Sequence, residues 1–186
     1  MAVPIVASAL LPLTAAPAVS RNVKPSASSL LAPRTVCADT SATNEPLELQ
    51  LRAMACLVNY ARRSRGLRQL PLSAALAQAG SWKLADEVSC GEFSHTPCGR
   101  PWLSGFTRSG YLRGARTYAV GENLAFGEGQ SGSPRRIFTA WLNSPDHCNN
   151  LLDPSWRQMG LALAKPQDFQ GHTDVTLWAN EFGARH

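Results

Sequence analysis

The patterned part of the chain begins with an amphipathic helix after residue 46. Apolar side chains recur there at spacings of four and three residues, at Leu47, Leu51, Met54, Val58 and Ala61. This is the period of a helix that buries one face. Pro46 is typical of a first helical turn and Gly66 of a helix end, so these two residues mark the expected limits.

Two further helices are predicted downstream. One follows Pro71 with Ser73 as its N-cap. Its expected apolar face carries Leu76, Gly80, Leu84 and Val88. The other begins at Ser133-Pro134, runs through Ile137, Ala140 and Trp141, and stops before Pro145, since the residue that precedes a proline is disfavoured in helical backbone.

Strand patterns appear near the C-terminus. Residues 159–164 alternate large and small side chains, and residues 175–182 are rich in β-branched and aromatic side chains. Between the second and third helices, residues 91–117 are rich in Gly, Pro, Ser and Arg. They predict a long loop, which is uncommon in a compact domain unless it is functional. Helices followed by closing strands predict an α+β fold.

The first 45 residues lack such periodicity. Residues 1–18 carry no charged side chain, are largely apolar, and end on Ala16-Pro17-Ala18, which fits the cleavage site of a secretory signal peptide. The segment departs from the usual pattern because no Lys or Arg precedes the apolar stretch. Residues 19–45 predict a flexible lead, and residues 46–184 predict the folded domain. No later stretch is apolar enough to predict a membrane span.

Length and charge narrow the classes of protein. With 186 residues, of which 44% are hydrophobic, the chain predicts one domain with one core. The formal net charge is +5. Arginines supply most of it: Arg62, Arg63, Arg65, Arg68, Arg100, Arg108, Arg113, Arg116, Arg135 and Arg136. An anionic surface is one possible partner and a solvated face is the other interpretation. No nucleic-acid partner is expected, because aromatic and basic residues are not interleaved.

Five cysteines favour an exported, oxidised protein. Cys90 and Cys98 bracket His95, so a bridge between them would fix the backbone of that histidine. A second bridge between Cys37 and Cys56 would tie the lead to the first helix and leave Cys148 odd. Buried, reduced thiols are the alternative for each of the five, because spacing alone does not determine connectivity.

Three short segments supply the candidate chemistry. They are Phe93-Ser94-His95, Gly121-Glu122-Asn123 and Ser144-Pro145-Asp146-His147. Imidazole and carboxylate groups bind divalent cations and transfer protons near neutral pH, so the three segments predict one shared site. Gly121 would permit an unusual backbone angle or a close approach beside Glu122. The structural alternative for the same residues is a helix cap, a carboxylate in a turn, and a loop histidine bonded to a carbonyl.

The segment around His147 resembles a helix start. Ser144 would be the N-cap, and Pro145 and Asp146 would occupy the first two helical positions. His147 follows at the third position, where the positive end of the helix disfavours imidazolium. A neutral ring would keep one nitrogen available for a metal or a proton.

Taken in order, these motifs resemble the bacterial branch of the CAP superfamily (cysteine-rich secretory proteins, antigen 5 and pathogenesis-related proteins, or SCP-like domains). The resemblance spans residues 47–183. It rests on five ordered motifs: Phe93-Ser94-His95-Thr96, Gly110-Tyr111, Gly121-Glu122-Asn123-Leu124-Ala125, Trp141 with Ser144-Pro145-Asp146-His147, and Asn150-Leu151-Leu152. The stretches Met159-Gly160-Leu161-Ala162 and Leu177-Trp178-Ala179-Asn180-Glu181-Phe182-Gly183 also resemble the final strands of that family.

The resemblance implies a three-layer α-β-α sandwich with a central antiparallel sheet and an open cleft. Two histidines and two acidic residues line this cleft in better-studied members, and some members bind zinc or another divalent cation there. His95 matches the first histidine, Glu122 the first carboxylate and His147 the second histidine. The second carboxylate has no clean match, since Ser144 follows Trp141 where a glutamate is expected, and Asp146 is a nearby substitute.

Two functions follow from the resemblance. One is a secreted binding protein whose cleft, formed by His95, Glu122, His147, Ser144 and Asp146, takes a divalent cation on His95 and His147. Its further ligand would be a lipid, a sterol or a cell-envelope component. The other is a metal-dependent, peptidase-like hydrolase in which Glu122 activates water.

Binding is favoured over catalysis. If Glu122 served as a ligand, only Asp146 would remain as a base. No Gly-x-Ser-x-Gly motif is present, and Cys148 is directly adjacent to His147 on a helix, where neighbouring side chains do not face each other. Cys148 is also a departure from the arginine that bacterial relatives carry at this place.

Overall fold

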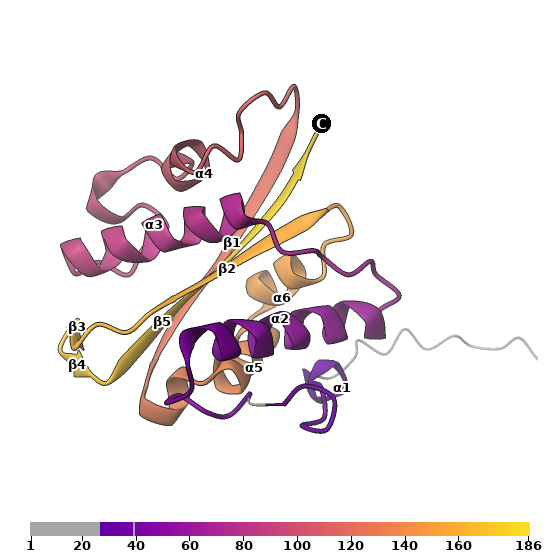
Figure 1. Cartoon of the computed structure of the whole chain (residues 1–186), viewed down its shortest axis with the longest axis vertical. Helices are drawn as coiled ribbons and strands as arrows, with labels where there is room; N and C mark the ends of the chain where they lie inside the picture. The colour runs from indigo at the N-terminus through magenta and orange to yellow at the C-terminus, as the bar shows by residue number, and fades with distance from the viewer. Residues whose placement is uncertain (1–26, 39) are drawn as a thin grey trace, which may run out of the picture.

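The computed structural model describes residues 27–38 and 40–186 of the chain (Figure 1). The predicted signal peptide over residues 1–18 lies outside the described residues, and so does the first part of the predicted lead. Within the described part of the chain, no helix is long and apolar enough to cross a membrane.

A three-stranded antiparallel sheet forms the centre of the molecule. Its strands are β1 (Tyr118–Glu128), β5 (Val175–Arg185) and β2 (Gln158–Ala164), in the order β1-β5-β2. The central strand β5 is buried along nearly its whole length. Two short strands, β3 (Asp168–Phe169) and β4 (His172–Thr173), form a separate hairpin between β2 and β5.

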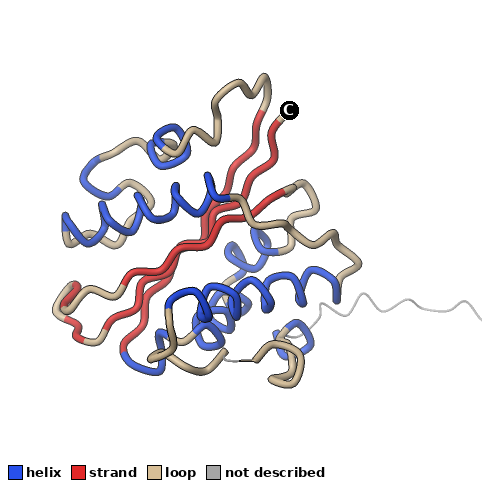
Figure 2. The backbone as a smooth tube through the Cα atoms, viewed as in Figure 1, coloured by secondary structure: helices blue, strands red, loops and turns tan. Residues whose placement is uncertain are grey.

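Helices cover both faces of this sheet (Figures 1 and 2). On one face lie α3 (Ala74–Cys90) and α4 (Ser104–Arg108). On the other lie α1 (Ala27–Leu30), α2 (Leu47–Ser64), α5 (Pro134–Asn143) and α6 (Pro145–Leu151). The short 3-10 helices η1 (Pro97–Gly99) and η2 (Gly129–Gly132) lie in connections. The predicted α+β class and three-layer sandwich are confirmed.

Helix α3 lies directly against the sheet because β2 has a glycine beneath the first turn of the helix. A Cβ atom at Gly160 would stand 2.2 Å from backbone atoms of both Leu76 and Ala77. The predicted cap at Ser73 is present, since its hydroxyl accepts from the Leu76 amide at 3.4 Å. The close contact at Gly160 therefore fixes the distance between α3 and the sheet. It thereby also fixes the positions of the side chains in the last turns of the helix.

The predicted apolar face of α3 is partly wrong. Leu76, Gly80 and Leu84 are buried, but Val88 is 37% exposed. Lys83 and Glu87 are buried in its place. Near the C-terminus of α3, the buried face carries charged side chains that have polar partners. Apolar periodicity alone therefore predicts the wrong buried residues in the last turn.

The second part of the predicted lead packs against the helices. Leu30, Ala32 and Cys37 are buried in the core that includes α2 and α5. A disulfide joins Cys37 to Cys56 of α2. This segment lacks periodicity because a few apolar side chains and one covalent bond hold it, rather than a continuous helical face. Likewise, the loop predicted over residues 91–117 contains η1 and α4.

Candidate functional site

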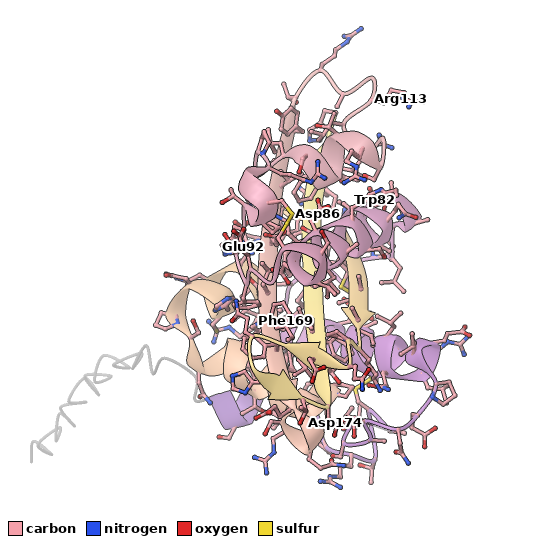
Figure 3. All side chains as sticks on the ribbon, turned by 90° about the vertical axis from the view of Figure 1, so that its left-hand side faces the viewer. Trp82, Asp86, Glu92, Arg113, Phe169 and Asp174 are labelled. Atoms are coloured by element: carbon pink, nitrogen blue, oxygen red, sulfur yellow. A yellow bond between two sulfur atoms is a disulfide. The ribbon has the colours of Figure 1, made fainter. Side chains whose placement is uncertain are left out.

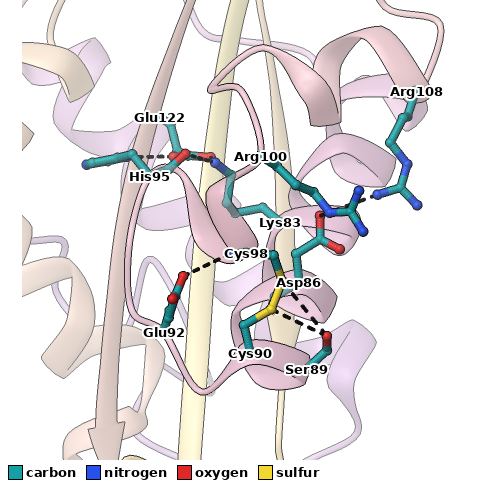
Figure 4. Close-up of polar contacts among 10 residues, drawn as sticks. All are labelled: Lys83, Asp86, Ser89, Cys90, Glu92, His95, Cys98, Arg100, Arg108 and Glu122. Atoms are coloured by element: carbon teal, nitrogen blue, oxygen red, sulfur yellow. Dashed lines mark hydrogen bonds and ion pairs between the residues drawn. A yellow bond between two sulfur atoms is a disulfide. The ribbon is translucent and has the colours of Figure 1, made fainter.

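His95 lies in a short loop that is closed by a disulfide between Cys90 and Cys98 (Figure 4). Two further contacts hold this loop. The Cys98 amide donates to Glu92 Oε2 at 2.8 Å, and the Lys83 ammonium donates to the carbonyl oxygen of His95. The backbone that carries the imidazole is therefore fixed covalently on one side and by a buried cation on the other.

Glu122, on strand β1, contacts the ring of His95. Its Oε1 lies 2.6 Å from His95 Nδ1, and its Oε2 lies 3.4 Å from Lys83 Nζ. The Glu122 side chain is 1% exposed, whereas the His95 side chain is 55% exposed. Figure 4 shows the second ring nitrogen of His95 directed away from Glu122. A buried carboxylate thus orients a histidine whose outer nitrogen remains accessible.

Two more carboxyl groups lie behind Glu122. Glu181 is its cross-strand partner on β5, and Glu87 reaches the same region from α3. Burial, followed by the charge of Glu122 and a hydrogen bond with it, raises the pKa of Glu181 well above its ordinary value. Burial also raises the pKa of Glu87 to about 8. The charge of Lys83 opposes both shifts only in part, because one ammonium cannot balance three ionised carboxylates.

His147 reaches the site from the first turn of α6. Its Nδ1 lies 2.7 Å from Ser144 Oγ, so the serine at the N-cap position orients the ring instead of capping the helix backbone. Burial, with the nearby charge of His95, lowers the pKa of His147, and the opposing effect of Asp146 is smaller. This shift favours the neutral ring, and its main cause is burial rather than the positive helix end on which the prediction from sequence rested.

A small amide network ties α6 to β1. Asn123 Nδ2 donates to the carbonyl oxygen of His147 at 3.1 Å, and Asn150 Nδ2 donates to Asn123 Oδ1 at 3.0 Å. Gly121 allows this approach, because a Cβ there would stand 2.7 Å from Asn150 Oδ1 and 2.8 Å from the Trp156 ring. Of the two roles predicted for Gly121, the close approach is present, and its backbone angle is ordinary.

These side chains border a cavity of ≈ 480 Å³. Its lining consists of His95, Glu122, Asn123, Asp146, His147, Asn149, Asn150 and Asp153. The structure therefore brings the predicted residues His95, Glu122, His147 and Asp146 to one polar cavity. Ser144 is not part of this lining and acts on the cavity through His147.

Sequence reasoning did not find Lys83, Glu87 or Glu181. Asp146, the substitute proposed for a second carboxylate, is exposed at the rim, whereas Glu181 is the buried carboxyl group beside Glu122. A signal was present in each case. Lys83 and Glu87 are charged residues four apart beside an apolar helix face, and Glu181 is the one charged residue within residues 175–184.

The donor chemistry of the site is that of two oriented imidazoles. Each ring has its Nδ1 engaged, by Glu122 in His95 and by Ser144 in His147, which leaves Nε2 of each ring for a ligand. A carboxylate behind a histidine is a common outer-shell arrangement in metal sites. Across the described residues, however, no cluster of three or more His, Cys, Asp or Glu is arranged to hold a metal ion.

A second cavity, of ≈ 590 Å³, adjoins the first and shares Asn149 and Asp153 with it. Its lining is more apolar and includes Leu30, Leu142, Leu152 and the side chain of Cys148. Cys148 is the one cysteine of the described chain outside a disulfide. It therefore belongs to this second cavity and is not among the residues that line the polar one.

Comparison with known proteins places the fold and the motifs in one family. The model of the cysteine-rich secretory protein (CAP) family matches residues 56–179, which is more than half of the chain. YkwD of Bacillus subtilis is 27% identical over 130 residues, an alignment that covers 68% of this chain and 44% of YkwD. The chain thus spans less than half the length of that relative.

Two solved structures share the fold. An outer surface protein of Borrelia burgdorferi superposes with a TM-score of 0.62 at 19% identity, over 76% of this chain and 97% of that one. An extracellular SCP-domain protein of Bacillus anthracis superposes with a TM-score of 0.56 at 20% identity, over 76% of this chain and 44% of that one. At these identities the superpositions support the fold alone. The family match, the ordered motifs and the three-layer sandwich together establish that this chain belongs to the CAP, or cysteine-rich secretory protein, family.

Proposed function

We propose that this chain is an exported CAP-domain binding protein whose polar cavity takes a small ligand from the cell envelope. The observation that carries the proposal is the pairing of Glu122 with His95 at 2.6 Å, beside a neutral His147, on the wall of a ≈ 480 Å³ cavity. Oriented polar groups around an open cavity are typical of small-molecule sites.

Export is supported by three observations. Two disulfides join four of the five cysteines, which suits an oxidising compartment. The N-terminal 18 residues resemble a signal peptide in composition. The similar proteins of B. anthracis and B. burgdorferi are described as an extracellular and an outer surface protein.

The lining of the cavity favours a polar ligand over a lipid or sterol. All eight lining residues are histidine, asparagine, aspartate or glutamate. Such groups would lose hydrogen bonds to water without replacement if an acyl chain filled the space. An apolar ligand would fit better in the adjoining cavity beside Leu30, Leu142 and Leu152. Within the proposed function, a hydroxyl- or amide-rich cell-envelope fragment is therefore the preferred ligand.

A divalent cation fits the site as an additional, weakly held component. His95 and His147 would hold it through Nε2, with Glu122 orienting the first ring and Ser144 the second. Two imidazoles leave the other coordination positions to water or to the ligand, which is unlike a closed structural zinc site. When bound, such a cation would polarise a ligand oxygen.

No specific observation favours the hydrolase alternative. Activation of water requires a carboxylate with a free oxygen, and the two oxygens of Glu122 face His95 on one side and Lys83 on the other. Asp146 lies at the exposed rim of the cavity, where its charge acts on His147, and among the described residues no hydrogen bond or ion pair orients its carboxylate.

The proposal can be tested by nuclear magnetic resonance with the purified chain. Soluble fragments of peptidoglycan are expected to shift the ring resonances of His95 and His147 and to leave those of His172, which lies outside the cavity lining, unchanged. A fatty acid is expected to leave the rings of His95 and His147 unchanged. Shifts of His172 equal to those of the two cavity histidines, or no shift with any envelope fragment, would overturn the proposal.

A further inference from the structure

Four arginines gather where the strands of the central sheet end. Because β5 runs antiparallel to both neighbours, its end lies beside the starts of β1 and β2. Arg185 pairs with Tyr118, the Arg116 amide donates to the His186 carbonyl at 2.7 Å, and the Arg157 amide donates to the Gly183 carbonyl at 2.9 Å. Arg113 precedes this region in the loop that enters β1. We call Arg113, Arg116, Arg157 and Arg185 the strand-end arginines.

Among the described residues, no ion pair neutralises this group. All four side chains belong to exposed residues, and none lies within ion-pair distance of a described carboxylate. The neighbouring Arg100 and Arg108 differ, since both pair with Asp86, at 2.9 Å and 3.3 Å. The positive charge at the strand ends is therefore available to an external anion.

The opposite end of the sheet has mixed charge. Glu128, Asp168 and Asp174 lie there together with Lys165 and His172. Figure 3 shows Arg113 and Asp174 at opposite ends of the molecule. The strand ends therefore differ from the opposite end of the sheet in carrying arginines that have no ion-pair partner within the described part of the chain.

Two of the four guanidinium groups are already held in place. Arg185 Nη1 donates to the Tyr111 carbonyl at 2.8 Å, and its guanidinium lies 5.0 Å from the centre of the Tyr111 ring. Arg157 Nη1 donates to the Ser155 carbonyl at 2.6 Å. Each group keeps further N–H donors, and a planar guanidinium matches the oxygens of a phosphate group.

We propose that the strand-end arginines bind a linear polyanion that carries phosphate groups. A polymer is favoured over a bilayer surface because only Tyr118 and Leu72, of the exposed large hydrophobic side chains described, lie near these strand ends. A face that inserts into a membrane presents more apolar area beside its cations. This inference stands on the charge distribution and is independent of the ligand proposed for the polar cavity.

The test is binding of fluorescently labelled inorganic polyphosphate to the purified chain, measured by anisotropy at several salt concentrations. The wild type is expected to bind at about 0.1 M salt and to weaken steeply as salt rises. The double variant Arg113→Gln, Arg116→Gln is expected to lose about tenfold in affinity. Its slope of log affinity against log salt should fall by about 1.4, or about 0.7 for each lost contact.

The matched control is Arg68→Gln, Arg136→Gln, which removes the same charge from two exposed arginines elsewhere that also lack an ion pair among the described residues. This control is expected to bind polyphosphate within about twofold of the wild type, because distant exposed charges are screened. Unfolding curves for each variant check that the fold is retained. Equal weakening in both double variants, absence of wild-type binding, or binding to phosphatidylglycerol vesicles with no binding to polyphosphate would overturn the proposal.

Discussion

Glu122 connects the exposed imidazole of His95 to the buried ammonium of Lys83. The Lys83 side chain is 4% exposed and the Glu122 side chain 1%, so each charge depends on the other for compensation. The same strand offers a contrast in Glu128, which pairs with His172 at 3.2 Å on the surface. Strand β1 thus carries two glutamates that pair with histidines, and the two pairs differ chiefly in how deeply the carboxylate is buried.

The variant Glu122→Gln is expected to lower the free energy of unfolding by about 2 kcal/mol at neutral pH, because Lys83 loses its ion-pair partner. The loss is partly compensated, since Glu181 can ionise once the charge of Glu122 is removed. Chemical denaturation measures this change. The control Glu128→Gln should cost less than about 0.5 kcal/mol, as exposed ion pairs do. If both variants lost the same free energy of unfolding, the contact between Glu122 and Lys83 would not contribute to stability.

Glu87 makes stability depend on pH. Burial raises the pKa of this carboxyl group from 4.5 to about 8, so the folded protein holds a proton there that the unfolded chain releases. The stabilising effect is complete below pH 4.5 and is lost as the pH rises through about 8.

The variant Glu87→Gln keeps an uncharged side chain of similar shape at every pH. It is expected to match the pH-independent part of the wild-type stability below pH 4.5, to gain on the wild type by roughly 1.4 kcal/mol for each pH unit between 4.5 and about 8, and to lead by up to several kcal/mol above pH 8. Denaturation curves collected across this range measure the difference. Parallel pH profiles for the two proteins would show that Glu87 ionises as freely in the folded state as in the unfolded chain.

At the scale of single residues, the sequence identified the residues that line the cavity and missed the charged residues buried behind Glu122. His95, Glu122 and His147 were found because imidazole and carboxylate groups on Gly- and Pro-marked segments are unusual. Lys83 and Glu87 were missed because charged residues are normally solvated, and their burial depends on three elements that meet only in the fold.

At the scale of elements, the loop of residues 91–97 has its ends joined by the Cys90–Cys98 disulfide. Helix α3 ends just before it, with Gly91 in the left-handed conformation at φ 65°. The loop therefore leaves the helix in a defined direction and carries His95 to the edge of β1. The predicted bridge follows from cysteine placement, whereas β1 itself was not predicted, because Gly121 and Gly127 interrupt its alternation.

Removing this bridge with Cys90→Ser, Cys98→Ser is expected to destabilise the protein by about 2 kcal/mol. It should also accelerate amide hydrogen exchange over residues 91–99, since the loop loses its closure. The control Cys37→Ser, Cys56→Ser should cost a similar free energy and leave exchange over residues 91–99 unchanged. Unaltered exchange in the first variant would mean that Lys83 and Glu92 hold the loop without the bridge.

The whole molecule places one polar cavity between the loop of His95, strand β1 and the start of α6, with positive charge at the strand ends of the sheet. The α+β class could be predicted from the periodicity of the helices and strands, and the three-layer arrangement from the family motifs. The packing of residues 30–37 did not, because it depends on a disulfide and a few buried side chains that leave no periodic pattern. Long-range contacts of that kind become visible only when the core is assembled.

Calorimetric titration with Zn²⁺ tests most directly whether His95 and His147 act as one binding site. The wild type is expected to bind one ion per chain, and His95→Ala and His147→Ala should each weaken binding at least about tenfold, because two imidazoles share the ion. The control His172→Ala, which disrupts the surface pair with Glu128, should bind as the wild type does. Equal affinity in all four proteins, or loss only with His172→Ala, would contradict a site shared by His95 and His147.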